Sequence, residues 1–199
     1  MCKDSHTPKH GTTDYVSSDS LNKGKMDLVV LKYMLHRLRM TLHTLEQSTI
    51  SQLPIFYLLE ERHGRTHRMA ICQPEVLLAS NHLHFVGFIS GKKASIEQTI
   101  VDEIERLDKV MLTEIMRLPG VLSYSSLELR TDRWYNLVIL GNTLVKESFH
   151  ALETHRYAAY QLAPFYYAWI RLHHGVINDG LAGQDMHLHG TKTFQFPSK

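Results

Sequence analysis

The sequence predicts an α+β fold in which a βαββαβ, ferredoxin-like unit carries an N-terminal extension made of a helix and a hairpin. Between His82 and Val176 the spacing of apolar residues switches between about two and about 3.6, in the order strand, helix, strand, strand, helix, strand. Gly and Pro residues separate these segments. This plan places both helices on one face of a sheet, so we expect a partner subunit, a ligand or both on the other face.

The first strand and the first helix of the unit have the clearest signals. Residues 82–89 alternate between two faces, and Gly91 ends the run. Ser95 and Gln98 match a capping box at the start of the helix, and Pro119 ends it. The helix has one apolar stripe with steps of three and four: Ile96, Ile100, Ile104, Leu107, Met111, Ile115 and Leu118. The later elements are expected over residues 121–129 and 134–140 (strands), 143–162 (helix) and 166–176 (strand).

The rest of the chain is expected to surround this unit. The predicted divisions are a flexible tail over 1–25, an N-terminal extension over 26–80, the ferredoxin-like domain over 81–178 and a C-terminal tail over 179–199. Leucines spaced by three and four from Leu28 to Leu45 predict a helix, and residues 55–61 and 67–71 predict a hairpin. The first tail lacks apolar periodicity, so we expect it to be dispensable for folding.

Composition narrows the classes of partner. A net charge of +2 with 21% charged residues gives no signature of nucleic-acid binding. Two cysteines do not make a disulfide framework, which favours a cytoplasmic location. No apolar run reaches the ~18 residues that a membrane helix needs, so no membrane partner is expected.

Alternation along the strands predicts which residues share a face. We expect Leu83, Phe85, Ile89, Tyr135, Leu137, Ile139, Ile170 and Leu172 to face the two helices of the unit. The opposite face then collects His82, His84, Val86, Tyr124, Ser126, Glu128, Trp134, Asn136, Val138, Trp169, Arg171 and His173. Aromatic residues mixed with titratable ones suit a ligand cavity. A dimer interface is the alternative, and both hold if two sheets close around a cavity.

Individual side chains on that face suggest roles. Arg171 can hold a carboxylate or phenolate by paired hydrogen bonds, or it forms an ion pair with Glu128. His173 can act as a general base, or it bonds a backbone carbonyl. His82 and His84 point the same way, but spacing fixes no third ligand, so no metal site is predicted.

Three segments resemble the dimeric α+β barrel superfamily, which includes the antibiotic-biosynthesis monooxygenases. They are Trp134-Tyr135-Asn136-Leu137-Val138, a helix with His155-Arg156, and Ala163-Pro164-Phe165-Tyr166-Tyr167 before Ile170-Arg171-Leu172-His173. The resemblance implies a small-molecule site in a barrel cavity. The aromatic face with Trp134 and Trp169, which one chain alone would leave in water, predicts a homodimer that packs sheet to sheet. It implies that Asn136 and Trp134 hold an aromatic substrate and oxygen. In haem-binding members a helical histidine binds iron, and His155 or His150 is the candidate here. The two histidines are five residues apart, which is a rotation of about 140° around a helix, so we expect that both do not face one pocket.

The sequence therefore predicts a small-molecule enzyme of the monooxygenase-like barrel type, with or without haem. The proposed catalytic residues are Asn136, Arg171 and His173, the ligand-binding residues are Trp134, His84, Trp169 and Tyr124, and the cofactor-binding residue is His155. We expect the polar groups among them to line one cavity. A non-catalytic dimeric ligand-binding or assembly protein is the alternative. An RNA binder is disfavoured because the chain is nearly neutral and lacks an aromatic-rich RNP-like strand.

Overall fold

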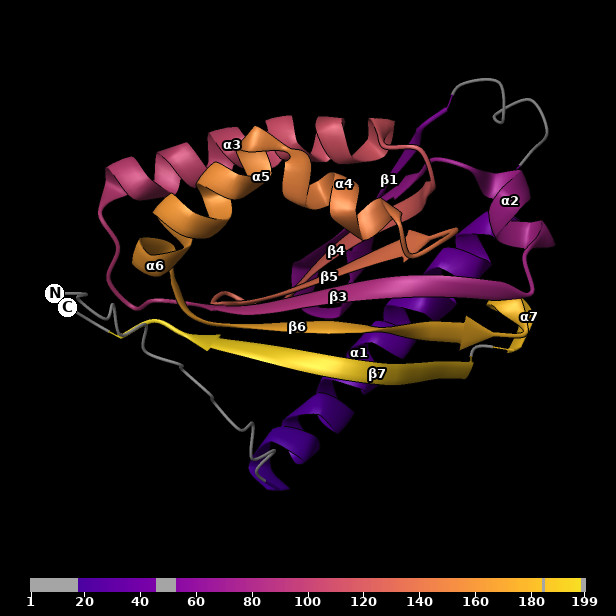
Figure 1. Cartoon of the computed structure of the whole chain (residues 1–199), viewed down its shortest axis with the longest axis horizontal. Coiled ribbons are helices and arrows are strands. Elements are labelled where there is room, and N and C mark those ends of the chain that lie inside the picture. The colour runs from indigo at the N-terminus through magenta and orange to yellow at the C-terminus, as the bar shows by residue number, and fades with distance from the viewer. Residues whose placement is uncertain (1–17, 46–52, 184, 198–199) are drawn as a thin grey trace, which may run out of the picture.

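Helices cover both faces of one antiparallel sheet (Figure 1). The structure is a computed structural model of the 199-residue chain, and it describes residues 18–45, 53–183 and 185–197. The strands are β1 (Ile55–Glu61), β2 (Arg65–Ile71), β3 (His82–Lys92), β4 (Val121–Arg130), β5 (Arg133–Leu140), β6 (Tyr167–Asn178) and β7 (Asp185–Gln195). The order across the sheet is β1-β2-β4-β5-β3-β6-β7, and all neighbours are antiparallel.

The central part of this sheet has the predicted ferredoxin-like order. Strands β4, β5, β3 and β6 lie side by side, with β5 and β3 in the middle. The prediction that the first and third strands of the unit are central is therefore confirmed. The predicted hairpin is also confirmed, as β1 and β2, and it extends the same sheet beside β4.

The helices differ more from the prediction than the strands do. They are α1 (Ser18–His43), α2 (Pro74–Ala79), α3 (Gln98–Arg117), α4 (Val145–Ala151), α5 (Glu153–Tyr157), α6 (Ala163–Tyr166) and α7 (Gly180–Gly183), with a π-helical turn over Ala158–Leu162 and a 3-10 turn over Arg62–Gly64. Glu97, not Ser95, is the N-cap of α3, and no side chain caps it, so the predicted capping box is wrong. The predicted single helix over 143–162 breaks at Leu152, whose backbone is extended.

Two segments predicted as tails belong to ordered elements. Residues 18–25 form the start of α1, whereas residues 1–17 of the predicted first tail lie outside the described residues. Residues 185–195 form β7, which pairs along β6. A free β6 edge would leave a row of unpaired backbone groups, and β7 satisfies them. The Gly-rich sequence around β7 hid this pairing because it lacks a clean apolar alternation.

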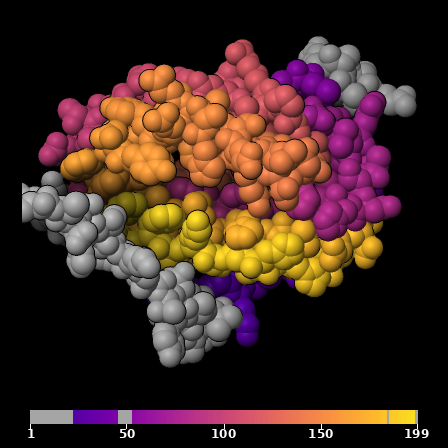
Figure 2. Space-filling model, in the orientation of Figure 1, coloured from indigo at the N-terminus to yellow at the C-terminus, as the bar shows by residue number. Residues whose placement is uncertain are grey.

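Two hydrophobic cores lie on opposite faces of the sheet. On one face α1 packs through Leu31, Leu35 and Leu38 against Phe85 and Leu137. On the other face α3 and α4 pack on a smaller core, built from Ala70, Cys72, Ile115, Val121, Tyr124, Val138, Leu140 and Val145. Figure 2 shows the side chains of α3 to α6, pink to orange, closely packed over the sheet, with β7 in yellow at its edge.

This arrangement corrects the predicted faces. Leu83, Phe85 and Ile89 face α1 rather than the helices of the βαββαβ unit. The face expected to be free of helices is the one that α3 and α4 cover, because Val138 and Tyr124 lie in their core. Periodicity fixes which residues of a strand share a face, but not which helix covers that face.

The predicted phase of β6 is wrong by one residue. Ile89 pairs with Arg171 and Gly87 pairs with His173, so both polar side chains lie on the α1 face. Asn136 pairs with Phe88, on the face of α3. Because Arg171 and His173 are polar although they face the core, the alternation along β6 did not show which side is buried.

The two tryptophans therefore lie on opposite faces of the sheet. Trp134 pairs with Ser90, on the α3 face, and Trp169 packs against the α1 core. The single aromatic face that motivated a sheet-to-sheet homodimer does not exist, and α1 occupies the face on which Trp169 lies. The homodimer itself stays a prediction.

Candidate functional site

A cavity of ≈ 370 Å³ opens between the first half of α1 and the strands β4, β5 and β6. Its walls come from Lys23, Met26, Asp27 and Val30 on α1, Leu129 and Arg130 on β4, Arg133 and Tyr135 on β5, and Arg171 on β6. The lining thus combines four basic side chains and one carboxylate with three aliphatic side chains. The volume lies within the range of small-molecule sites, ~300–1,000 Å³.

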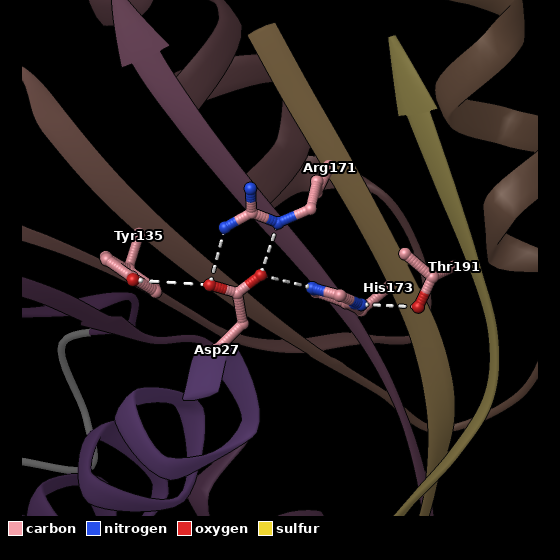
Figure 3. Close-up of polar contacts among 5 residues, drawn as sticks. All are labelled: Asp27, Tyr135, Arg171, His173 and Thr191. Carbon is pink, nitrogen blue, oxygen red and sulfur yellow. Dashed lines mark hydrogen bonds and ion pairs between the residues drawn. The ribbon is translucent and has the colours of Figure 1, made fainter. Parts of the chain in front are cut away.

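Asp27 is the centre of the polar network beside this cavity (Figure 3). Its side chain is 2% exposed and accepts hydrogen bonds from Arg171 Nε to Oδ2 at 2.6 Å and from Arg171 Nη2 to Oδ1 at 2.8 Å. The hydroxyl of Tyr135 lies 3.3 Å from Oδ1, and His173 Nε2 lies 3.0 Å from Oδ2. The carboxylate is therefore saturated, and it ties α1 to β5 and β6.

These contacts set the electrostatics of Asp27. Burial alone raises the pKa of its carboxyl, but the hydrogen bonds from His173 and Arg171 and their charges outweigh burial and lower the pKa below its ordinary value. The charged form of Asp27 is thus the stable one inside the protein. Tyr135 responds in the opposite direction: burial, and then the nearby charge of Asp27, raise the pKa of its phenol.

The imidazole of His173 has both ring nitrogens engaged. Nε2 faces Asp27, and Nδ1 lies 2.8 Å from the hydroxyl of Thr191 on β7. A hydroxyl, an imidazole and a carboxylate in a row is the geometry that activates a nucleophile. Here, however, the side chain of His173 is 0% exposed, and neither His173 nor Thr191 lines the cavity. The row therefore serves to position α1 and β7 on the sheet.

Trp169 makes cation–π contacts with two of the lining arginines. The guanidinium carbon of Arg171 lies 4.1 Å from the centre of its ring, and that of Arg133 lies 5.5 Å away. The ring itself lies on Gly91, where a Cβ would come within 2.3 Å of Trp169 Nε1. Glycine at that position is therefore needed for the stack.

Arg133 differs from Arg171 in its hydrogen bonding. Its Nε atom is buried and has no hydrogen-bond partner among the described residues. A buried, unpaired donor is unfavourable, by about 1–3 kcal/mol. Arg133 is one of the residues that line the cavity.

The predicted residues Trp134, Asn136 and Tyr124 lie together on the other face, between the sheet and α3. The hydroxyl of Tyr124 donates to Asn136 Oδ1 at 2.9 Å. The guanidinium of Arg68 lies 5.9 Å from the Trp134 ring and bonds Asp108 of α3. Burial, and then the charge of Asp108, raise the pKa of Tyr124. None of the three predicted residues lines the cavity beside α1.

His84 belongs to a different place again, near α4. Its ring packs edge-on against His82, with the ring centres 5.1 Å apart. Burial, followed by the charges of His82, Lys146 and His189, lowers the pKa of His84. Within the described ranges, no three or more His, Cys, Asp or Glu side chains are grouped so that they could hold a metal ion.

His155 and His150 are neighbours although five residues separate them in the sequence. Their ring centres are 5.9 Å apart because the break at Leu152 redirects the chain between them. Burial lowers the pKa of His155, and its Nδ1 has no hydrogen-bond partner among the described residues. A cavity of ≈ 440 Å³ lies nearby, lined by Ala151, Glu153, Arg156, Tyr157, Tyr160 and Gln161. Neither histidine lines it.

The predicted convergence of Asn136, Arg171, His173, Trp134 and His84 on one cavity is thus wrong. Arg171 lines the α1 cavity, while Asn136, Trp134 and His84 lie on the opposite face of the sheet. The partner of Arg171 is Asp27 and not Glu128. The catalytic, ligand-binding and haem roles assigned to these residues stay predictions.

Sequence reasoning missed Asp27, Arg133 and Thr191. A signal for Asp27 was present, because it lies four residues before Leu31, on the apolar stripe of the predicted helix. A carboxylate on a buried stripe is almost always paired. Nothing in the local sequence of Arg133 or Thr191 distinguishes them from surface residues.

Comparisons with known proteins give a distant structural match. No protein-family model and no curated protein matches the chain. The chain is structurally similar to SnoaB, a cofactor-independent oxygenase from Streptomyces nogalater, with 14% sequence identity and a TM-score of 0.35. The match covers 50% of this chain and 93% of that one.

Proposed function

We propose that this protein binds a small organic anion with an apolar body in the cavity between α1 and the sheet. The observation that carries the proposal is the buried Nε of Arg133, which has no hydrogen-bond partner among the described residues at the wall of a ligand-sized cavity. A carboxylate or phosphate group supplies the acceptor that this donor lacks.

The charge of the lining favours an anion over a cation. Asp27 is the only acidic side chain among the lining residues, and Arg171 forms an ion pair with it. The Trp169 ring lies beside Arg133, which has no carboxylate partner among the described residues. Arg130 reaches the same lining from β4. An anion therefore meets a positive wall.

The apolar wall of the cavity determines what the uncharged part of the ligand can be. Met26 and Val30 of α1 and Leu129 of β4 form an aliphatic wall. Such a wall excludes a small, fully hydrated anion and accepts a hydrocarbon or aromatic body. The ligand that fits both walls is an amphiphilic acid.

We favour binding over catalysis because the buried polar groups beside the cavity already use their hydrogen-bonding capacity within the protein. The carboxylate of Asp27 is saturated, and His173 uses both ring nitrogens inside the protein. The monooxygenase-like activity predicted from the sequence stays a prediction, and its candidate residues Asn136 and Trp134 lie on the other face of the sheet.

Isothermal titration with a panel of aromatic and aliphatic carboxylates tests the proposal, with the matching alcohols as uncharged ligands. We expect binding of acids and not of alcohols. Arg133→Met should weaken binding by roughly tenfold or more, since a hydrogen bond to a charged group contributes about 1.5–3 kcal/mol.

Arg68→Met is the matched control, because Arg68 also lies over a tryptophan but on the opposite face of the sheet. It should leave the affinity unchanged. Equal affinity of acids and alcohols, or equal losses in both variants, would contradict the proposal.

A further inference from the structure

The solvent-facing side of α1 carries a second apolar stripe. Met26 is 68% exposed, Val29 63%, Met40 48% and Tyr33 41%. With 100° of rotation per residue, these four positions span about 60° of the helix surface. They lie opposite the side on which Leu31, Leu35 and Leu38 pack against the sheet. The stripe is therefore not part of either core.

A row of basic residues runs directly beside this stripe. Its members are Lys25, Lys32, His36, Arg39 and His43, which also span about 60° of the helix surface. Between Lys23 and Leu45 the only acidic residue is Asp27, and it is buried against the sheet. The outer face of α1 thus combines apolar side chains with the positive charge of Lys25, Lys32 and Arg39. The carboxylate of Glu61 on β1 also reaches this face, where it accepts hydrogen bonds from Tyr33 and Arg37.

We infer that this outer face of α1 docks on an anionic lipid surface. A helix with an apolar stripe and a flanking row of Lys and Arg lies in the plane of a membrane interface, with the apolar side chains inserted and the cations at the headgroups. At about 1.5 Å per residue, the 26 residues of α1 span about 39 Å, so the face is long. Figure 1 shows α1 crossing the sheet on the face opposite α3, and its apolar stripe is 41–68% exposed in the described part of the chain.

A second copy of the chain fits this face less well. If two copies pack α1 against α1 around a two-fold axis, with the helices antiparallel, each basic row meets its own counterpart. With the helices parallel, the row meets the side that carries Lys23 and Arg37. The antiparallel arrangement brings like charges together, which is unfavourable, and the parallel one offers the row a carboxylate, Glu61, that is already paired with Arg37. A surface of acidic headgroups complements the row.

The cavity adjoins the same face. Met26 belongs to the apolar stripe and also lines the cavity. Lys23, near the start of α1, lines the cavity as well. A docked protein would hold the cavity next to the lipid surface, from which an amphiphilic acid can enter. The docking proposal rests on the outer face of α1 alone and does not require that the cavity be occupied.

The test is co-sedimentation of the full chain with vesicles. Vesicles of phosphatidylcholine with about 30% phosphatidylserine provide the anionic surface, and pure phosphatidylcholine provides the neutral one. We expect binding to the anionic vesicles, little binding to the neutral ones, and a steep loss of binding as salt rises.

The variant Lys25→Glu with Lys32→Glu should reduce binding to anionic vesicles by roughly tenfold or more. The matched control is Lys109→Glu with Val110→Ser, which changes an exposed basic and an exposed apolar residue on α3, on the other side of the sheet. It should bind like the wild type, and thermal melts should show both variants folded. No binding to anionic vesicles at low salt, equal binding to neutral vesicles, or the same loss in the control overturns the proposal. None of these outcomes affects the titrations with soluble acids.

Discussion

Each face of the sheet has an ion pair between a helix and a strand, and the pair is buried on one face and exposed on the other. On the α1 face the ion pair of Asp27 with Arg171 joins side chains that are 2% and 11% exposed. On the α3 face the ion pair of Asp108 with Arg68 joins side chains that are 34% and 40% exposed. Both pairs connect a helix to a strand, at 2.6 Å and 3.1 Å. They differ in exposure and in the additional hydrogen bonds that Asp27 accepts from Tyr135 and His173.

This difference shows where a charge determines the structure. A pair in water contributes little, because solvent screens both partners. A buried pair must be complete, because removing one partner leaves the other charged and unsolvated. Asp27 can therefore fix the position of α1 on the sheet, whereas Asp108 adjusts the surface of α3.

The largest expected effect is the loss of Asp27. Asp27→Ala should lower the free energy of unfolding by about 3–5 kcal/mol, because Arg171 and His173 lose their partner in the interior. Asp108→Ala should lower it by about 0–1 kcal/mol. Urea denaturation followed by circular dichroism measures both values. Similar losses in the two variants would show that burial does not distinguish the pairs.

Neighbouring residues of β5 compare the two cores directly. Leu137 faces the α1 core and Val138 faces the α3 core, and they are 1% and 8% exposed. Leu137→Ala should lower the free energy of unfolding by about 2–5 kcal/mol and Val138→Ala by about 1–2 kcal/mol, because truncating valine removes fewer carbon atoms and leaves a smaller cavity. Chemical denaturation tests this order. A larger loss at Val138 would make the α3 face the main core.

The bond between Tyr124 and Asn136 tests the uncharged polar groups of the α3 face. Asn136→Ala leaves the buried hydroxyl of Tyr124 without its acceptor, which should cost about 1–3 kcal/mol. Tyr124→Phe combined with Asn136→Ala should cost less than the sum of the single changes, because the double variant has no orphaned group. Additive losses would mean that the bond contributes nothing.

The smallest expected effect is a change in acid stability. Because the folded-state pKa of Asp27 lies below its ordinary value of 3.8, its contribution is fully present above that value. It is lost as the pH falls from 3.8 through the lower folded-state pKa. Asp27→Asn should therefore show a shallower fall of unfolding free energy below pH 3.8 than the wild type. An unchanged slope would assign the acid sensitivity to another group, such as Glu61, whose pKa is also lowered.

Local periodicity was sufficient for most of the elements. The apolar stripe predicted α3 to within a few residues, and the leucine spacing predicted the body of α1. The β1–β2 hairpin and the central order of the sheet also followed from the sequence. These features depend on residues close together in the chain, whose burial repeats with the period of the element.

The sequence by itself determined which residues of a strand share a face, and the tertiary structure decided what covers that face. Alternation along β5 grouped Trp134 with Asn136, but it carried no information about the phase of β6 relative to β5. Arg171 and His173 were predicted to line a ligand cavity, but their partner is Asp27, 144 and 146 positions earlier in the chain. Burying charge is favourable only with a partner in place, and a partner so distant in sequence is supplied by packing alone.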